Sequence, residues 1–170
     1  GISFLACSNE KDQKVETTPE PTKKMLKALI IDGENNHGVW PMTTMMMHDY
    51  LKETGLFEVD IQRTANTWQG PHYDNSIGLE DITDLLEMYP IPNGQLTNSV
   101  EEPVPDSTFS PTFSDYNVVI SNMGWKASTW PAATQANFEK YIKNSARCPS
   151  LFLRFHHFYL IVDISTLSKN

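Results

Sequence analysis

The order of apolar and polar positions along the chain predicts three strands. Apolar residues stand next to one another over most of residues 26–32 and 116–121, which is typical of strands that are buried on both faces. Over residues 57–63, apolar and polar positions alternate, which indicates a strand with one face in water. We therefore expect two inner strands and a third strand nearer the edge of a sheet.

Two amphipathic segments predict the helices that connect these strands. Residues 41–54 begin with Pro41, which suits a first helical turn, and Gly55 supplies a helix stop. Pro131 begins a second helical pattern over residues 131–143. Because helices alternate with buried strands, we expect an α/β domain with a mainly parallel sheet.

Residues 64–112 show no clear periodicity, although residues 77–89 are compatible with a short helix. This segment carries aromatic and polar side chains of the kinds that sugar sites combine. They are Trp68, His72, Tyr73 and Asp74. The alternative is an ordinary surface segment whose aromatic side chains tuck beneath it.

Polar side chains follow both buried strands. Those after the first strand are Glu34, Asn35, Asn36 and His37, and those after the second are Asn122, Gly124 and Trp125. Parallel strands end at the same edge of a sheet, where α/β proteins bind ligands, so we expect both groups to converge there. The asparagine amides suit a hydroxyl-rich ligand, but they are equally suited to capping turns.

Four segments of the chain resemble the ThuA-like (trehalose-utilisation) family. They are residues 28–37, 55–59 and 113–122, and Trp130-Pro131. The resemblance covers residues 24–144 apart from a poorly matching middle, and it implies the class I glutamine amidotransferase-like fold, a flavodoxin-like three-layer sandwich. It also implies a role in sugar metabolism, with trehalose or a related disaccharide or keto-sugar as substrate.

The family pattern breaks after Asn144, where the resemblance calls for a glycine-rich turn, an apolar strand and a loop with a histidine. Residues 151–155 are compatible with that strand, and His156 or His157 stands where the histidine is expected. We therefore expect a truncated or divergent end and a sheet that is incomplete at its C-terminus. An uncovered central strand would make the chain marginally stable or prone to self-association.

Two hypotheses about function follow. In the first, the protein is a sugar-processing enzyme in which His37, helped by Glu34 or Asp32, moves a proton on a bound carbohydrate. In the second, the protein is a non-catalytic carbohydrate-binding or accessory domain. The ligand contacts expected in both are Asn35, Asn36, Asn122, Gly124 and Trp125.

Several kinds of chemistry are not expected. Neither Cys7 nor Cys148 has the glycine-flanked strand-to-helix context of a nucleophile, which excludes a glutamine amidotransferase. The chain has no phosphate-binding glycine motif, so we expect no nucleotide cofactor. The acids and histidines of the proposed site, even with His156 or His157, lack short metal-ligand spacing, so we expect no metal.

Composition narrows the range of partners. The 170 residues are 39% hydrophobic, which is ordinary for one globular domain. The formal net charge of −8 is unfavourable for binding nucleic acid or an anionic membrane surface. The chain contains no apolar stretch of the roughly 20 residues that a transmembrane helix requires. A neutral small-molecule carbohydrate remains compatible with this charge.

The first 24 residues predict a separate segment ahead of a domain over residues 25–170. Residues 2–9 resemble the end of a bacterial lipoprotein signal, with small Ala6 directly before Cys7. Residues 10–24 are rich in charged residues, threonine and proline, so we expect a disordered tether. The prediction is a domain that is lipid-anchored through Cys7 in the bacterial cell envelope and faces the periplasm or the exterior; the alternative is a free thiol on a disordered end.

Overall fold

The computed structural model describes residues 24–72, 83–145, 151–155 and 158–162. The strands are β1 (Leu26–His37), β2 (Phe57–His72), β3 (Asn98–Val100), β4 (Val118–Ser121), β5 (Leu151–Phe155) and β6 (Phe158–Val162). The helices are α1 (Trp40–Glu53), α2 (Thr83–Met88), α3 (Ala132–Ser145) and the short 3-10 helix η2 (Phe113–Asp115).

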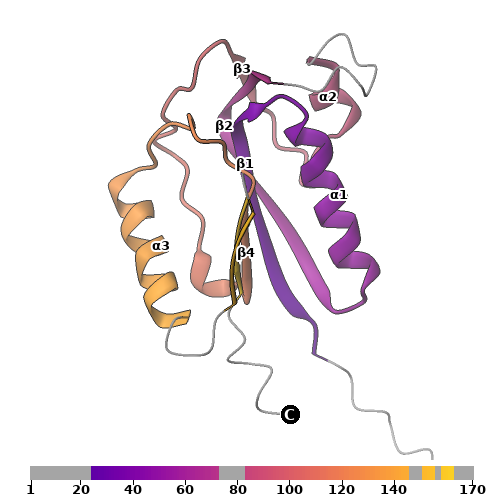
Figure 1. Cartoon of the computed structure of the whole chain (residues 1–170), viewed down its shortest axis with the longest axis vertical. Coiled ribbons are helices and arrows are strands. Elements are labelled where there is room, and N and C mark those ends of the chain that lie inside the picture. The colour runs from indigo at the N-terminus through magenta and orange to yellow at the C-terminus, as the bar shows by residue number, and fades with distance from the viewer. Residues whose placement is uncertain (1–23, 73–82, 146–150, 156–157, 163–170) are drawn as a thin grey trace, which may run out of the picture.

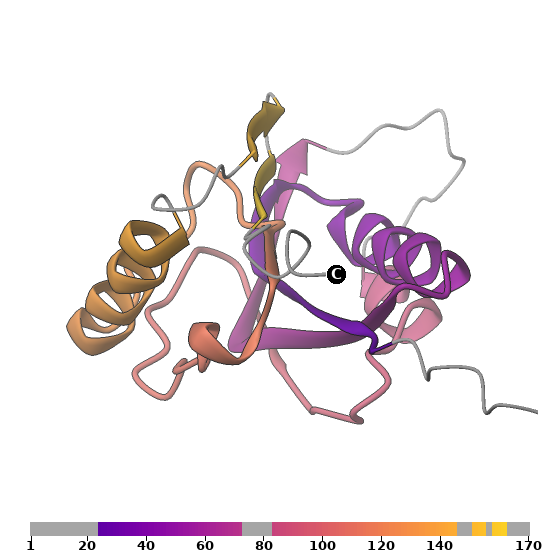
Figure 2. The same ribbon diagram turned by 90° about the horizontal axis from the view of Figure 1, so that it is seen from below.

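The strands form one mainly parallel sheet in the order β3-β2-β1-β4-β6-β5. β1 pairs in parallel with β2 and β4, and β2 pairs in parallel with β3. Apart from the short β3, the parallel strands follow the order β2-β1-β4, which is the start of the flavodoxin-like order. α1 and α3 lie on opposite faces of this sheet (Figure 1 and Figure 2), so the predicted α/β three-layer sandwich is confirmed.

β1 is the centre of the hydrophobic core, as its unbroken apolar run predicts. Leu29 and Ile31 face α3 and pack in one buried cluster with Phe113 and Val119. On the other face, Ala28 and Ile30 belong to a second cluster, against which methionines of α1 pack. Side chains alternate between the two faces of a strand, so both faces of β1 are covered.

β1 and β2 extend further than the apolar pattern predicts. Residues 34–37, which we expected to form a loop, continue β1 and pair with β2 as far as His37 and His72. The register shifts on either side of Glu34 and Asn35, and Gly33, with φ of 132°, takes up the first irregularity. A backbone conformation open mainly to glycine therefore lets the ladder continue into polar sequence.

The segment after β2 is only partly as expected. Residues 64–72, which we expected to be irregular, belong to β2. The short helix predicted within residues 77–89 is present as α2. Tyr73 and Asp74 lie outside the described residues.

The C-terminal strands differ from the rest of the sheet. β6 pairs antiparallel with β4, and β5 pairs antiparallel with β6 at the edge of the sheet. The outer edge of β4, which we expected to be uncovered, is therefore paired. The predicted strand over residues 151–155 is present, whereas Cys7, Cys148, His156 and His157 lie outside the described residues.

Within the described ranges, no helix has the length and apolar character required to cross a membrane.

Candidate functional site

The predicted site lies where the connections from neighbouring strands diverge. β1 leads into α1 on one face of the sheet, whereas β4 leads towards α3 on the other (Figure 1). This is a topological switch point, the usual place for a ligand in an open α/β sheet. The backbone N–H of Asn122 donates to the carbonyl of Ile31 at 2.8 Å, and that of Gly124 donates to the carbonyl of Glu34 at 2.8 Å. The two polar groups predicted from the sequence therefore do converge.

Asn35 and Asn122 join the two strands to the start of α1. Asn35 Nδ2 donates to the backbone oxygen of Asn122 at 3.0 Å, and Asn35 Oδ1 accepts the backbone N–H of His37 at 2.9 Å. Asn122 Nδ2 lies 2.9 Å from Thr44 Oγ1 and 3.2 Å from the carbonyl oxygen of Trp40. Both amides are buried, so the structure uses them as internal connections between three segments.

Asp32 is held in a buried ion pair with Arg63. Nε and Nη2 of Arg63 each donate to one carboxylate oxygen of Asp32 at 2.8 Å. The guanidinium also lies over the ring of Trp40, 4.7 Å from its centroid. Sequence reasoning singled out Asp32 but missed Arg63, although the predicted parallel pairing of their strands was a signal that the two could be neighbours.

Glu34 connects two distant segments of the chain to β1 through hydrogen bonds. Its Oε1 accepts the backbone N–H of Val104 at 2.9 Å. Its Oε2 accepts both the backbone N–H and the hydroxyl of Ser128 at 2.6 Å. The carboxylate is fully buried and is stabilised by these three donors, which no spacing in the sequence would have revealed.

Asn36 is enclosed by glycines. A Cβ atom on Gly124 would lie 2.6 Å from both the backbone nitrogen and Oδ1 of Asn36, and one on Gly70 would lie 2.7 Å from its carbonyl oxygen. Both positions therefore require glycine for close packing. Asn36 Oδ1 in turn accepts the backbone N–H of Trp125 at 3.3 Å, which fixes the backbone at that tryptophan.

Fewer of the predicted site residues reach solvent than are buried. His37 is half-buried at the end of β1, and Gly124 is also half-buried. The Trp125 side chain is 69% exposed, and Lys126 Nζ lies 5.2 Å from the centroid of its ring. The exposed ring of Trp125 is therefore the part of the predicted site that a ligand can touch.

Trp68 does not contribute to this exposed surface. It is 3% exposed, and its Nε1 donates to the carbonyl oxygen of Glu101 at 3.0 Å. Its own carbonyl oxygen accepts Nε1 of Trp40 at 3.0 Å. The structure therefore agrees with the interpretation in which the aromatic residue tucks beneath the surface.

The described residues contain no group of three or more histidine, cysteine or acidic side chains that could hold a metal ion. The carboxylates of Asp32 and Glu34 both point to internal partners instead.

Comparison with known proteins finds one structural similarity to report. No family model matches the chain, and no curated protein sequence matches it significantly. Among solved structures, the chain is similar to a protein of Parabacteroides merdae ATCC 43184 that carries the provisional description ThuA-like, with 22% sequence identity and a TM-score of 0.46. The match covers 71% of this chain and 30% of the Parabacteroides protein, so the chain spans well under half of that protein's length. The description names the family that the four sequence segments resemble.

Proposed function

We propose that the chain is a carbohydrate-binding domain that acts in the metabolism of trehalose or a related disaccharide or keto-sugar, with its ligand site at the carboxyl ends of β1 and β4. The observation that carries this proposal is Trp125. Its side chain is 69% exposed, yet its backbone is held by Asn36 and by the close approach of Gly124. A large exposed ring on a fixed backbone loses little conformational freedom when it binds.

The ligand class follows from the chemistry of this edge. An indole ring offers a flat apolar surface that suits the C–H face of a sugar ring. His37 ends β1 at the same edge of the sheet, next to Asn36, whose Oδ1 accepts the backbone N–H of Trp125. The net charge of −8 is compatible with a neutral ligand.

Binding without turnover is favoured by the state of the two acids. Asp32 is engaged by Arg63, and Glu34 accepts three hydrogen bonds, so neither carboxylate is placed to assist His37. A catalytic acid or base must come within hydrogen-bond reach of the proton it moves. The alternative is an enzyme in which His37 moves the proton. In that enzyme, His37 has to act without help from Asp32 or Glu34.

The test is a calorimetric titration with trehalose and with its keto form. Replacing Trp125 with alanine removes the stacking surface, and we expect affinity to fall roughly tenfold. Tyr50→Ala is the matched control, because Tyr50 is also an exposed aromatic residue, at 60%, but lies on α1. Equal affinity of the Trp125→Ala variant and the native chain would contradict the proposal.

The same preparation separates the two functions. Incubation with each sugar, followed by product analysis, should yield unchanged sugar if the domain only binds. Turnover that disappears in His37→Ala while binding persists would establish the enzyme instead.

We further propose that Cys7 carries the lipid that holds the domain in the bacterial cell envelope. Support comes from Ala6 directly before Cys7 and from the polar sequence of residues 10–24 that follows. Mass spectrometry of the membrane fraction should show a lipid-modified Cys7, and Cys7→Ser should move the protein out of that fraction. An unmodified Cys7 in the membrane fraction would contradict the anchor.

A further inference from the structure

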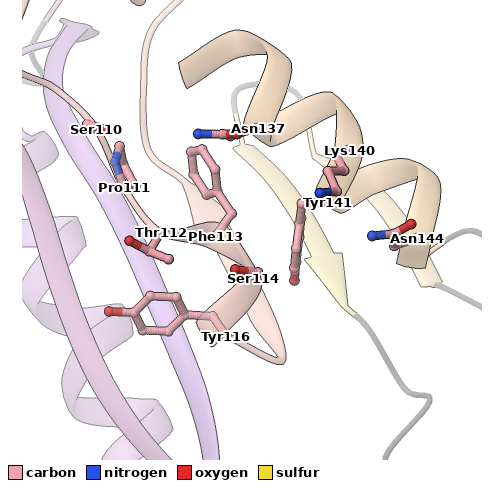
Figure 3. A pocket seen from close by; sticks show the side chains of 10 residues that line it. All are labelled: Ser110, Pro111, Thr112, Phe113, Ser114, Tyr116, Asn137, Lys140, Tyr141 and Asn144. Carbon is pink, nitrogen blue, oxygen red and sulfur yellow. The ribbon is translucent and has the colours of Figure 1, made fainter. Parts of the chain in front are cut away.

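A cavity of about 410 Å³ lies at the other edge of the sheet from the Trp125 site. Figure 3 shows it between the segment of residues 110–116, which precedes β4, and α3. This segment enters the sheet at the amino end of β4, whereas Trp125 follows its carboxyl end. The cavity is therefore separate from the proposed carbohydrate site.

The floor of the cavity is aromatic and firmly packed. Phe113 and Tyr141 are 1% and 6% exposed, and their ring centroids lie 6.3 Å apart. Trp130 and Phe138 also pack against Phe113, with ring centroids 6.0 Å and 5.0 Å from its own. Because both rings are buried, they form a rigid base beneath the cavity but present no ring face to a ligand.

One wall of the cavity is a polar stripe along α3. Asn137, Lys140 and Asn144 are spaced by three and four residues, so they share one side of the helix, and their side chains line the cavity (Figure 3). Within the described part of the chain, no hydrogen bond or ion pair engages these three side chains. Lys143, by contrast, pairs with Glu139 at 3.3 Å. The stripe therefore presents donors that a ligand can use.

The charge of the lining comes from Lys140. Burial and the hydrogen bond that Tyr116 donates to Asp60 at 2.9 Å both raise the pKa of Tyr116, so that phenol stays neutral. The remaining polar groups are hydroxyls and amides, such as Ser110 and Ser114 on the opposite wall. Lys140 is thus the charged side chain of the lining, while the carboxylates of Asp60 and Asp115 act on Tyr116 from beside the cavity.

The position of the lysine favours a single negative charge on the ligand. Lys140 and Asn144 lie in the C-terminal half of α3, where the helix dipole presents its negative end and opposes a dianion more strongly than a monoanion. A phosphate dianion is usually held by backbone N–H groups or by a helix N-terminus, and this wall offers the opposite end. One lysine and several neutral donors instead match a monocarboxylate with hydroxyl groups.

We propose that this cavity binds a hydroxylated monocarboxylate of the size of one sugar ring, namely a sugar acid. Its carboxylate meets Lys140, and its hydroxyls bond to Asn137 and Asn144. The volume falls within the range of small-molecule sites, roughly 300–1,000 Å³. The inference uses none of the residues on which the proposed function rests.

Titration with glucuronate, followed by NMR of the side-chain amides of Asn137 and Asn144, tests the site. We expect saturable shifts of both amides in the native chain. Lys140→Gln should weaken binding roughly tenfold, because it removes a charge-assisted bond. Lys143→Gln, the matched control on the same helix, should bind within about twofold of the native chain.

Two further ligands and one further variant complete the test. Glucose, which lacks the carboxylate, should bind the cavity at least about tenfold more weakly, and glucose 6-phosphate no more tightly than glucuronate. Trp125→Ala should leave glucuronate binding unchanged, so failure at one site is distinguished from failure at the other. Absence of saturable shifts, native-like binding by Lys140→Gln, or tighter binding of the phosphate would overturn the proposal.

Discussion

The two polar regions of this molecule differ in how their side chains are used. At the carboxyl ends of β1 and β4, Asp32, Glu34, Asn35 and Asn122 are buried and bonded to other parts of the chain. Along α3, the polar side chains that line the cavity are exposed and, among the described residues, engage no partner. Polar residues that directly follow a strand are thus not necessarily ligand contacts.

The difference has a physical cause. The residues of the first group lie at the buried ends of β1 and β4, where water does not reach them. Their polar atoms must therefore find partners inside the fold. The second group lies on a helix surface, where water satisfies the same kinds of atoms. Substitutions should therefore reduce stability in the first region and affect mainly ligand binding in the second.

The largest expected effect comes from Arg63. Arg63→Ala leaves the buried carboxylate of Asp32 without its bidentate partner, and we expect the free energy of unfolding to fall by about 3–5 kcal/mol. Urea denaturation followed by circular dichroism measures this change. A loss below about 1 kcal/mol, as for a surface ion pair, would show that the pair is solvated. The strand ends would then not differ from the exposed surface of α3 in how they use polar side chains.

The control for Arg63 removes both charges. In the double variant Asp32→Leu with Arg63→Met, no buried charge is left unpaired, so most of the lost stability should return. If the double variant is as unstable as Arg63→Ala, packing around Trp40 accounts for the effect instead of charge.

Glu34→Gln should have the next largest effect. Glutamine offers one acceptor oxygen in place of two, so either the bond from Val104 or both bonds from Ser128 are lost, at about 1.5–3 kcal/mol. Hydrogen exchange at the backbone amides of Val104 and Ser128 would report which segment is released. Glu139→Gln, on the exposed side of α3, is the control and should change stability by less than about 0.5 kcal/mol. Unchanged exchange at both amides would contradict the role given to Glu34.

Much of the fold could be predicted from the sequence because its signals are local. The unbroken apolar run of β1, the alternation in β2 and Pro41 in the first turn of α1 each predict one element, and parallel pairing follows from the helical crossover. The continuation of β1 beyond Asp32 could not be predicted in this way. It depends on Gly33, whose φ of 132° admits an irregularity, and on a partner strand that also continues.

The position of the candidate site could be predicted from the sequence, but the hydrogen-bond partners of its residues could not. That Glu34 to His37 would meet Asn122 to Trp125 follows from the parallel arrangement of their strands. The partners that satisfy them do not follow, because Val104 and Ser128 are 70 and 94 residues away from Glu34 along the chain. Only the folded structure separates the exposed Trp125 from the internally bonded amides around it.

Asp106, which accepts the backbone N–H of Ala65 in β2, allows a pH test of a smaller effect. Burial raises the pKa of its carboxyl, but hydrogen bonds from Ala65 and Thr108 lower it more, so the folded-state pKa lies below the ordinary 3.8. Its contribution is therefore present above that value and is lost as the pH falls through the folded pKa. We expect Asp106→Asn to cost about 1 kcal/mol at neutral pH, with the difference from the native chain vanishing at low pH. A difference independent of pH, measured by urea denaturation from neutral pH downwards, would contradict this.

The smallest expected effect is on the stability of the second region, where substitutions on α3 should change the free energy of unfolding by almost nothing. Asn137→Ala and Lys140→Gln alter exposed side chains of α3 whose polar atoms water can satisfy, so each should change the free energy of unfolding by less than about 0.5 kcal/mol. Alanine and glutamine are good helix formers, which leaves helix propensity little affected. Urea denaturation of both variants beside Glu34→Gln measures the contrast under one set of conditions. A loss as large as that of Glu34→Gln would mean that the cavity stripe supports the fold in the same way as the strand ends, and the distinction between the two regions would not hold.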